Sequence, residues 1–70
     1  MSENVNVIVN GETRAVGRDA TLLDLLHSLD LDPRTVVVEH NRRIVRRAGL
    51  GGVHVAPGDA IELVHFVGGG

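Results

Sequence analysis

The sequence predicts an α+β fold, in which one main helix packs on one face of a mixed sheet of four to five strands. The spacing of apolar residues changes along the chain, from every second residue to helical spacing and back again. The last apolar run, residues 61–67, is apolar on both faces, which suits a central strand. A length of 70 residues favours a single domain, and its core must be aliphatic because Phe66 is the only aromatic residue.

A β-hairpin is predicted at the start of the chain. Valines occupy every second position from residue 5 to residue 9, the pattern of a strand with one buried face. Asn10-Gly11 follows, and both residues tolerate the positive φ of a tight hairpin turn. We therefore expect the return strand over residues 12–16.

A short helix is predicted next, over residues 21–29. Its apolar residues fall on one stripe at helical spacing, namely Leu22, Leu25, Leu26 and Leu29. Thr21 is a suitable N-cap, and Asp24 three residues later resembles a capping box in which Asp replaces Glu. A helix this short is marginal alone, so we expect its leucines to pack on the sheet.

The second half of the chain is predicted to be mostly strand. A β-branched run at residues 36–39 indicates a strand, and residues 44–45 begin a short partner. Residues 46–52 are interpreted as an irregular loop anchored by Leu50, with room for a brief strand at residues 53–55. The turn sequence P-G-D at residues 57–59 precedes the final strand, whose natural partner is the first strand.

The final strand leads into three glycines, Gly68, Gly69 and Gly70. We expect residues 1–67 to form the domain and residues 68–70 a flexible tail. A strand that presents a bare carboxylate suggests that the carboxylate of Gly70 is the working group. Gly68 and Gly69 give the tail access to an enclosed active site, because glycine has no Cβ to collide with a narrow channel.

Composition excludes several classes of function. Without Cys, the chain has no disulfide and no thiolate ligand, and the spacing of its four His residues does not indicate a metal site. A net charge of −2 gives no basic footprint for nucleic acid. No segment resembles a membrane span or a secretion signal, so we expect a cytoplasmic protein. No nucleophile–base arrangement is visible, and we expect no enzyme activity.

Segments along nearly the whole chain resemble the ubiquitin-like sulfur carriers of the β-grasp fold, and in particular the ThiS type of thiamine biosynthesis. The matching segments are V-N-G at residues 9–11, T-L-L-D-L-L at 21–26, V-V-V-E-H-N at 36–41, P-G-D at 57–59 and I-E-L-V-H-F-V-G-G-G at 61–70. Each segment is common by itself. Their order and spacing, together with the glycine end, make the combination specific.

The resemblance implies a chemistry for the tail. In that family an E1-like adenylyltransferase, using ATP and magnesium, adenylates the C-terminal carboxylate, here that of Gly70. A persulfide donor then supplies sulfur, which leaves a thiocarboxylate, and thiazole synthase accepts that sulfur. The carrier is a co-substrate in this scheme and binds no cofactor itself.

Alternation along the final strand predicts a partner-binding surface. If Ile61 and Leu63 face the helix, then Glu62, Val64 and Phe66 face away from it, and Ile8 of the first strand joins them. An open apolar patch on a small domain marks a partner site, and Phe66 is the expected anchor. Ordinary burial of Val64 and Phe66 under a loop is the alternative.

Three other functions stay open at this point. The carrier subunit of molybdopterin synthase shares the fold and the Gly-Gly end. A ubiquitin-like modifier would join its C-terminus to lysines of target proteins. A β-grasp binding module with an inert tail would not use its C-terminus at all, and blocking that end distinguishes it from the others.

Overall fold

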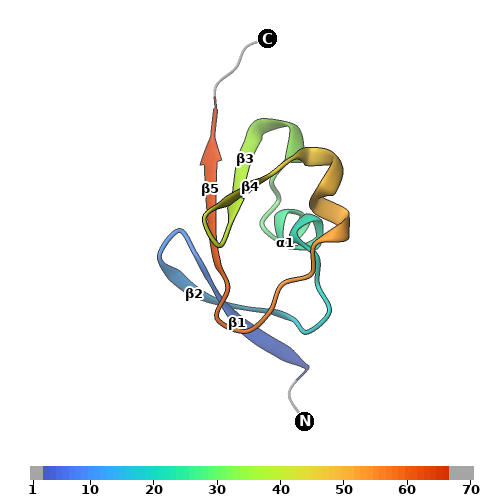
Figure 1. Cartoon of the computed structure of the whole chain (residues 1–70). Helices are drawn as coiled ribbons and strands as arrows, with labels where there is room; N and C mark the ends of the chain where they lie inside the picture. The colour runs from blue at the N-terminus through green and yellow to red at the C-terminus, as the bar shows by residue number, and fades with distance from the viewer. Residues whose placement is uncertain (1–2, 67–70) are drawn as a thin grey trace.

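The computed structural model describes residues 3–66 and contains a five-stranded sheet with one α-helix (Figure 1). In chain order its elements are β1 (Asn4–Val9), β2 (Glu12–Gly17), α1 (Leu22–Ser28), the 3₁₀ helix η1 (Pro33–Thr35), β3 (Val36–His40), β4 (Arg43–Val45), the 3₁₀ helix η2 (Arg47–Gly52) and β5 (Ala60–His65). The predicted α+β class and the single main helix are confirmed.

The sheet has the strand order β2-β1-β5-β3-β4. The β1 and β5 strands run parallel, whereas the other three neighbouring pairs are antiparallel. The final strand is therefore central and lies beside the first strand, as predicted. Figure 1 shows β5 continuing past the β1–β2 hairpin, so that only β3 accompanies its last residues.

The β1–β2 hairpin turns at Asn10-Gly11, as the sequence predicts. Asn10 has a φ of 50° and Gly11 a φ of 84°. These left-handed values at both central residues fit the tight turns whose twist matches that of paired strands. A second turn at Asn41-Arg42, with φ values of 51° and 72°, joins β3 to β4.

The α1 helix begins with the predicted capping box. Thr21 Oγ1 accepts a hydrogen bond from the Asp24 backbone N–H at 3.1 Å, and Asp24 Oδ2 accepts one from the Thr21 N–H at 3.0 Å. Leu29 is the C-cap, so the predicted range of 21–29 includes both cap residues. The helix packs its leucines on one face of the sheet. The core consists of Val7, Val9, Leu22, Leu25, Leu26, Val36, Val38, Leu50, Val55 and Ile61.

The connection between β4 and β5 differs from the prediction in two respects. Residues 47–52 form η2 rather than an irregular loop, although Leu50 is the buried anchor as expected, with 1% of its surface exposed. Residues 53–55 make a single bridge, between His54 and Thr21, rather than a brief strand. This segment bonds to the start of α1, where the Leu22 N–H donates to the Val53 carbonyl oxygen. Because the chain continues from there as a helix, no strand lies beside the segment to extend the bridge into a ladder.

Candidate functional site

The end of β5 is fixed to β3 as far as the last described residue. Val36 lies opposite His65 in the ladder, and the Phe66 N–H donates to the Thr35 carbonyl oxygen at 3.1 Å. The sheet therefore aims the chain at a defined point immediately before residue 67. Gly68, Gly69 and Gly70, the three tail residues predicted to be functional, lie outside the described residues.

Asn10 supports the middle of β5 with its side chain. Its Oδ1 accepts from the Leu63 N–H at 2.7 Å, and its Nδ2 donates to the Leu63 carbonyl at 3.2 Å. These are the two bonds that a strand residue would make, so the amide extends the β1 side of the sheet beyond the register pairs that end at Val9 and Ile61. Asn10 therefore both forms the hairpin turn and positions the strand that leads to the tail.

A polar cluster fixes the start of β5. Asn41 Oδ1 accepts from the Ala60 N–H at 2.9 Å, and Asp59 Oδ2 lies 2.6 Å from His40 Nε2. Burial raises the pKa of the Asp59 carboxyl, but hydrogen bonds from His40, the Ala56 N–H and Asn41 outweigh it and hold that pKa below its ordinary value. The ionised carboxylate thus ties the turn before β5 to the end of β3.

The sheet face opposite α1 carries exposed apolar side chains. The large ones are Ile8, Val37, Ile44, Val64 and Phe66. Val64 is 56% exposed and Phe66 48% exposed, so neither is buried under a loop within residues 3–66. Ile8, Glu62, Val64 and Phe66 are thus all exposed on this face, and their role in binding a partner stays a prediction. We call this set, with Val37, Glu39 and Ile44, the outer face.

Sequence reasoning missed Val37 and Ile44. Val37 lies opposite Val64 in the β3–β5 ladder, and Ile44 lies opposite Glu39 in the β3–β4 ladder. Paired residues project from the same face of a sheet, so the register places both on the outer face. The run Val36-Val37-Val38 offered no polar alternation that could separate its middle residue from its neighbours.

Two glutamates meet on the outer face. Glu39 and Glu62 are directly opposite each other in the β3–β5 ladder. Neither carboxylate has an ion-pair partner within residues 3–66. Like charges directly opposite each other destabilise a strand pair, so this arrangement is one that folding alone does not favour. An apolar surface with an acidic centre fits a partner surface that carries a basic side chain.

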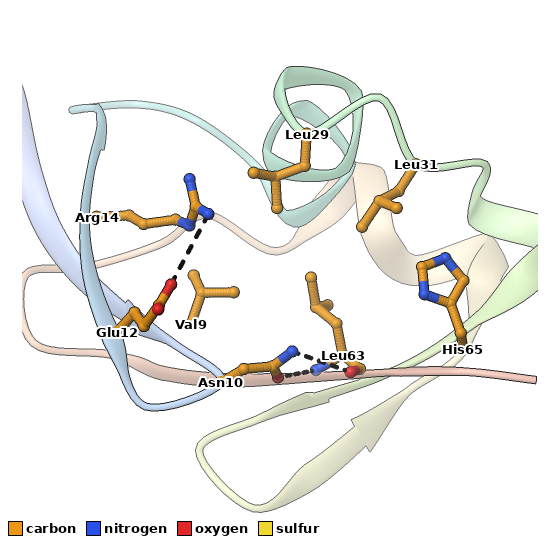
Figure 2. A pocket seen from close by; sticks show the side chains of 8 residues that line it. All are labelled: Val9, Asn10, Glu12, Arg14, Leu29, Leu31, Leu63 and His65. Atoms are coloured by element: carbon orange, nitrogen blue, oxygen red, sulfur yellow. Dashed lines mark hydrogen bonds and ion pairs between the residues drawn. The ribbon is translucent and has the colours of Figure 1, made fainter.

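On the helix side, a pocket of about 270 Å³ lies between the end of α1 and β5 (Figure 2). Its lining residues are Val9, Asn10, Glu12, Arg14, Leu29, Leu31, Leu63 and His65. The leucines form an apolar wall, whereas Arg14 and Glu12 approach each other at 4.0 Å on the opposite side.

Other kinds of site find little support in the described chain. No group of three or more His, Cys, Asp or Glu side chains within residues 3–66 is arranged to hold a metal ion. No helix in this part of the chain is long and apolar enough to cross a membrane.

Comparison with known proteins gives a consistent result. The sequence profile of the ThiS family matches residues 7–70. The sulfur carrier protein ThiS of Bacillus subtilis is 44% identical over 50 residues, which cover 71% of this chain and 76% of that protein. The crystal structure of the thiamine biosynthesis protein ThiS from Geobacter metallireducens superposes with a TM-score of 0.81 at 32% identity, covering 94% of this chain and all of that one.

Thiazole synthases also match. The protein of that name from Paramagnetospirillum magneticum is 39% identical over 66 residues, and the one from Magnetococcus marinus has the same identity over the same length. The match covers 94% of this chain, but this chain spans only about a fifth of the length of either synthase. Each synthase therefore contains a segment similar to this chain within a much longer polypeptide.

Proposed function

The chain belongs to the ThiS family, and we propose on that basis that it acts as the sulfur carrier of thiamine biosynthesis, with the carboxyl group of Gly70 as the carrying group. The single observation that supports this most strongly is the family match, which extends through residue 70. In this role the protein is a co-substrate rather than an enzyme. Of the functions open from the sequence, the thiamine branch is the one that the relatives support.

The proposed chemistry begins with activation of Gly70. A carboxylate is a poor electrophile, because attack on it would have to expel oxide. An E1-like adenylyltransferase, using ATP and magnesium, would join the carboxylate to AMP and release pyrophosphate. The terminal sulfur of a persulfide donor would then attack the acyl carbon and expel AMP. This attack forms a carbon–sulfur bond and keeps the sulfur–sulfur bond of the persulfide. A thiol would finally cleave that sulfur–sulfur bond by forming a disulfide with the donor sulfur, which leaves the thiocarboxylate.

The residues of the chain have separate parts in this scheme. Gly68 and Gly69 would let the tail enter a narrow active site, since neither has a Cβ. Glycine also loses the most freedom on becoming ordered, so the tail alone would bind weakly. We therefore assign affinity to the outer face, where Phe66 lies directly before the tail. No cofactor is assigned to the chain itself, because ATP and magnesium belong to the activating partner.

Thiazole synthase is the proposed acceptor of the sulfur. Two proteins of that name contain a segment similar to this chain, and joining a carrier and its acceptor in one polypeptide would raise their effective concentration. The E1-like enzyme and the persulfide donor are further proposed partners, and neither nucleic acid nor a membrane has a part. We place the reaction in the cytoplasm, where ATP is available.

An intact-mass measurement tests this function. The 70-residue chain is incubated with ATP, magnesium, an E1-like adenylyltransferase and a persulfide donor, and fragments then locate any change. We expect one oxygen to be replaced by sulfur at Gly70. A chain with an amidated C-terminus is the control and should stay unchanged. An unmodified Gly70, with partner and donor proven active on another carrier, would contradict the proposal.

A further inference from the structure

The backbone groups of β5 alternate between its two neighbouring strands. The Asn41 N–H donates to the Ala60 carbonyl, and the Phe66 N–H donates to the Thr35 carbonyl. Because hydrogen-bonded pairs recur at every second residue of an antiparallel ladder, the even-numbered residues of β5 bond to β3. The odd-numbered residues must therefore point their N–H and C=O groups toward the opposite edge.

On that opposite edge, the β1 side supplies partners only as far as Leu63. The Asp59 and Ile61 carbonyls accept from β1 and the hairpin turn, and Leu63 bonds to the Asn10 side chain. His65 comes next in this series. Neither its N–H nor its C=O has a hydrogen-bond partner within the described chain, since β1 has already ended at its turn. The edge of β5 is thus open at His65.

The pocket on the helix side lies beside this open edge (Figure 2). His65, Leu63 and Asn10 line it along β5, and Leu29 and Leu31 line it from the end of α1. Its volume of about 270 Å³ is several times the roughly 30 Å³ that one water molecule occupies in the liquid. A side chain can therefore enter. Leu29 and Leu31 offer it an apolar wall, while Arg14 and Glu12 line the other side of the pocket.

We propose that an extended segment of the adenylating enzyme adds to β5 at His65 as an antiparallel strand and places an apolar side chain in this pocket. Strand addition draws its affinity from main-chain hydrogen bonds and its specificity from pockets for alternate side chains, and both features occur here together. The inference rests on the proposed function, since it names a contact made by the same activating partner.

The geometry favours an antiparallel segment. In an antiparallel pair, two opposing residues exchange both of their hydrogen bonds, which matches the free N–H and C=O of the single residue His65. Opposing residues also share a face, and His65 faces the helix side because its ladder partner Val36 is in the core. The residue opposite His65 would therefore direct its side chain toward the pocket.

Strand addition at His65 would also help to position the tail. The added strand would hold β5 from the edge that β3 does not occupy, immediately before the glycines. The adenylating enzyme would then contact the carrier at two places, the outer face and this edge of β5. This contact is separate from the outer face, because a different edge and the opposite face of the sheet provide it.

Amide hydrogen exchange of His65 provides the first test. Exchange is measured for the full chain alone and in its complex with the E1-like adenylyltransferase without ATP. In the free chain we expect His65 to exchange much faster than Val64, which pairs with β3, and Phe66, which bonds to Thr35 immediately before β3. In the complex the exchange of His65 should slow by about tenfold or more, and the methyl resonances of Leu29 and Leu31 should shift.

A pair of substitutions provides the second test. His65→Pro removes the free N–H but no ladder bond, because that group points away from β3. His65→Ala removes the same side chain and keeps the N–H. Relative to His65→Ala, the dissociation constant of His65→Pro for the enzyme should rise about tenfold, the effect of one lost hydrogen bond of ordinary strength. Exchange of Val64 and Phe66 confirms that both variants keep the β3–β5 ladder.

The outcomes separate this inference from the proposed function. If the enzyme binds and modifies the chain while His65 still exchanges freely, strand addition is wrong and the carrier function stands. Protection of His65 without a shift at Leu29 or Leu31 overturns the pocket assignment. Protection that appears on concentrating the chain alone identifies a second copy as the occupant and overturns the proposal. Absence of any binding or modification refutes both the inference and the function.

Discussion

The two faces of the sheet are formed by alternate residues of the same strands, yet they differ in burial. Along β1, Val7 and Val9 are 0% and 4% exposed, whereas Ile8 between them is 40% exposed. Along β3, the same contrast separates Val36 and Val38 from Val37. Side chains on the helix face complete the core, while apolar side chains on the outer face stay in contact with water.

This contrast indicates which residues folding requires and which it does not. The helix face is filled by α1 and Leu50, and no buried side-chain polar atom in the described chain lacks a hydrogen-bond partner. The outer face has five large apolar side chains that stay exposed, and two opposed glutamates that folding alone does not favour. Exposed apolar side chains lower solubility and here add nothing to the core, so the outer face is best explained as a surface that binds a partner. Substitutions on the two faces should therefore have different consequences.

The largest effect is expected on the helix face. Leu26→Ala removes a side chain with no exposed surface and should lower the free energy of unfolding by about 2–5 kcal/mol. The control is Ile44→Ala on the outer face, where 68% of the residue is exposed and the change should stay within about 0.5 kcal/mol. Denaturant unfolding measures both. Similar losses for the two variants would remove the distinction between the faces.

Phe66→Ala should have the opposite profile. We expect adenylation at low carrier concentration to slow about tenfold, because a large aromatic contact next to the tail is lost. The free energy of unfolding should change by less than about 1 kcal/mol, since about half of the residue is already exposed. Steady-state adenylation kinetics test the expected loss of rate, and denaturant unfolding tests the expected small change in stability. A large stability loss with normal adenylation would assign Phe66 to the core instead.

A smaller effect is expected at the start of α1. Thr21→Ala removes the hydroxyl that caps the Asp24 N–H, and it should lower the free energy of unfolding by about 1 kcal/mol. Thr21→Ser keeps a capping hydroxyl and should recover most of that loss. Adenylation should be unchanged in both variants, because Thr21 lies at the start of α1 and belongs neither to the outer face nor to the pocket at the end of α1. A slowed adenylation at full stability would place part of the partner site there.

The smallest effect concerns pH. The pKa of Asp59 is lowered despite burial, by bonds from His40, Ala56 and Asn41, and Arg34 lowers the pKa of Asp32 to about 2. A carboxyl group whose pKa is lower in the folded state than in the unfolded state stabilises the fold at pH values above its ordinary pKa of 3.8. That contribution is lost as pH falls from near 4 through the folded-state values.

Unfolding measured between pH 7 and pH 2 tests this expectation. The denaturant concentration at the midpoint of unfolding should decrease once the pH is lowered below about 4. This decrease should be smaller in Asp59→Asn, because an asparagine at residue 59 cannot titrate. An identical acid profile in the variant would show that the Asp59 cluster contributes nothing to the pH dependence.

Much of this architecture could be predicted because its signals are local. Asn10-Gly11 determines a tight turn, the spacing of the leucines determines a helix, and Thr21 with Asp24 determines where that helix starts. Alternation from Ile61 onward also placed Glu62, Val64 and Phe66 on the outer face. Each of these inferences needs only residues that are close together in the chain.

The features that escaped prediction depend on contacts between distant residues. The bonds from Asn10 to Leu63 span 53 positions, and the sequence presents Asn10 only as a turn residue. The exposure of Ile44 follows from the β3–β4 register, which a three-residue strand does not reveal. Activation by ATP and transfer from a persulfide came from the family resemblance, because three glycines alone specify access rather than chemistry.

The division between the two faces can be measured directly by methyl NMR. The chain is titrated with the E1-like adenylyltransferase, and the methyl groups of both faces are followed together. We expect Ile8, Val37, Ile44 and Val64 to shift or broaden, while Val7, Leu22, Leu26 and Leu50 stay unchanged. Shifts concentrated on α1 and η2, with the outer face unaffected, would contradict the assignment of binding to the outer face.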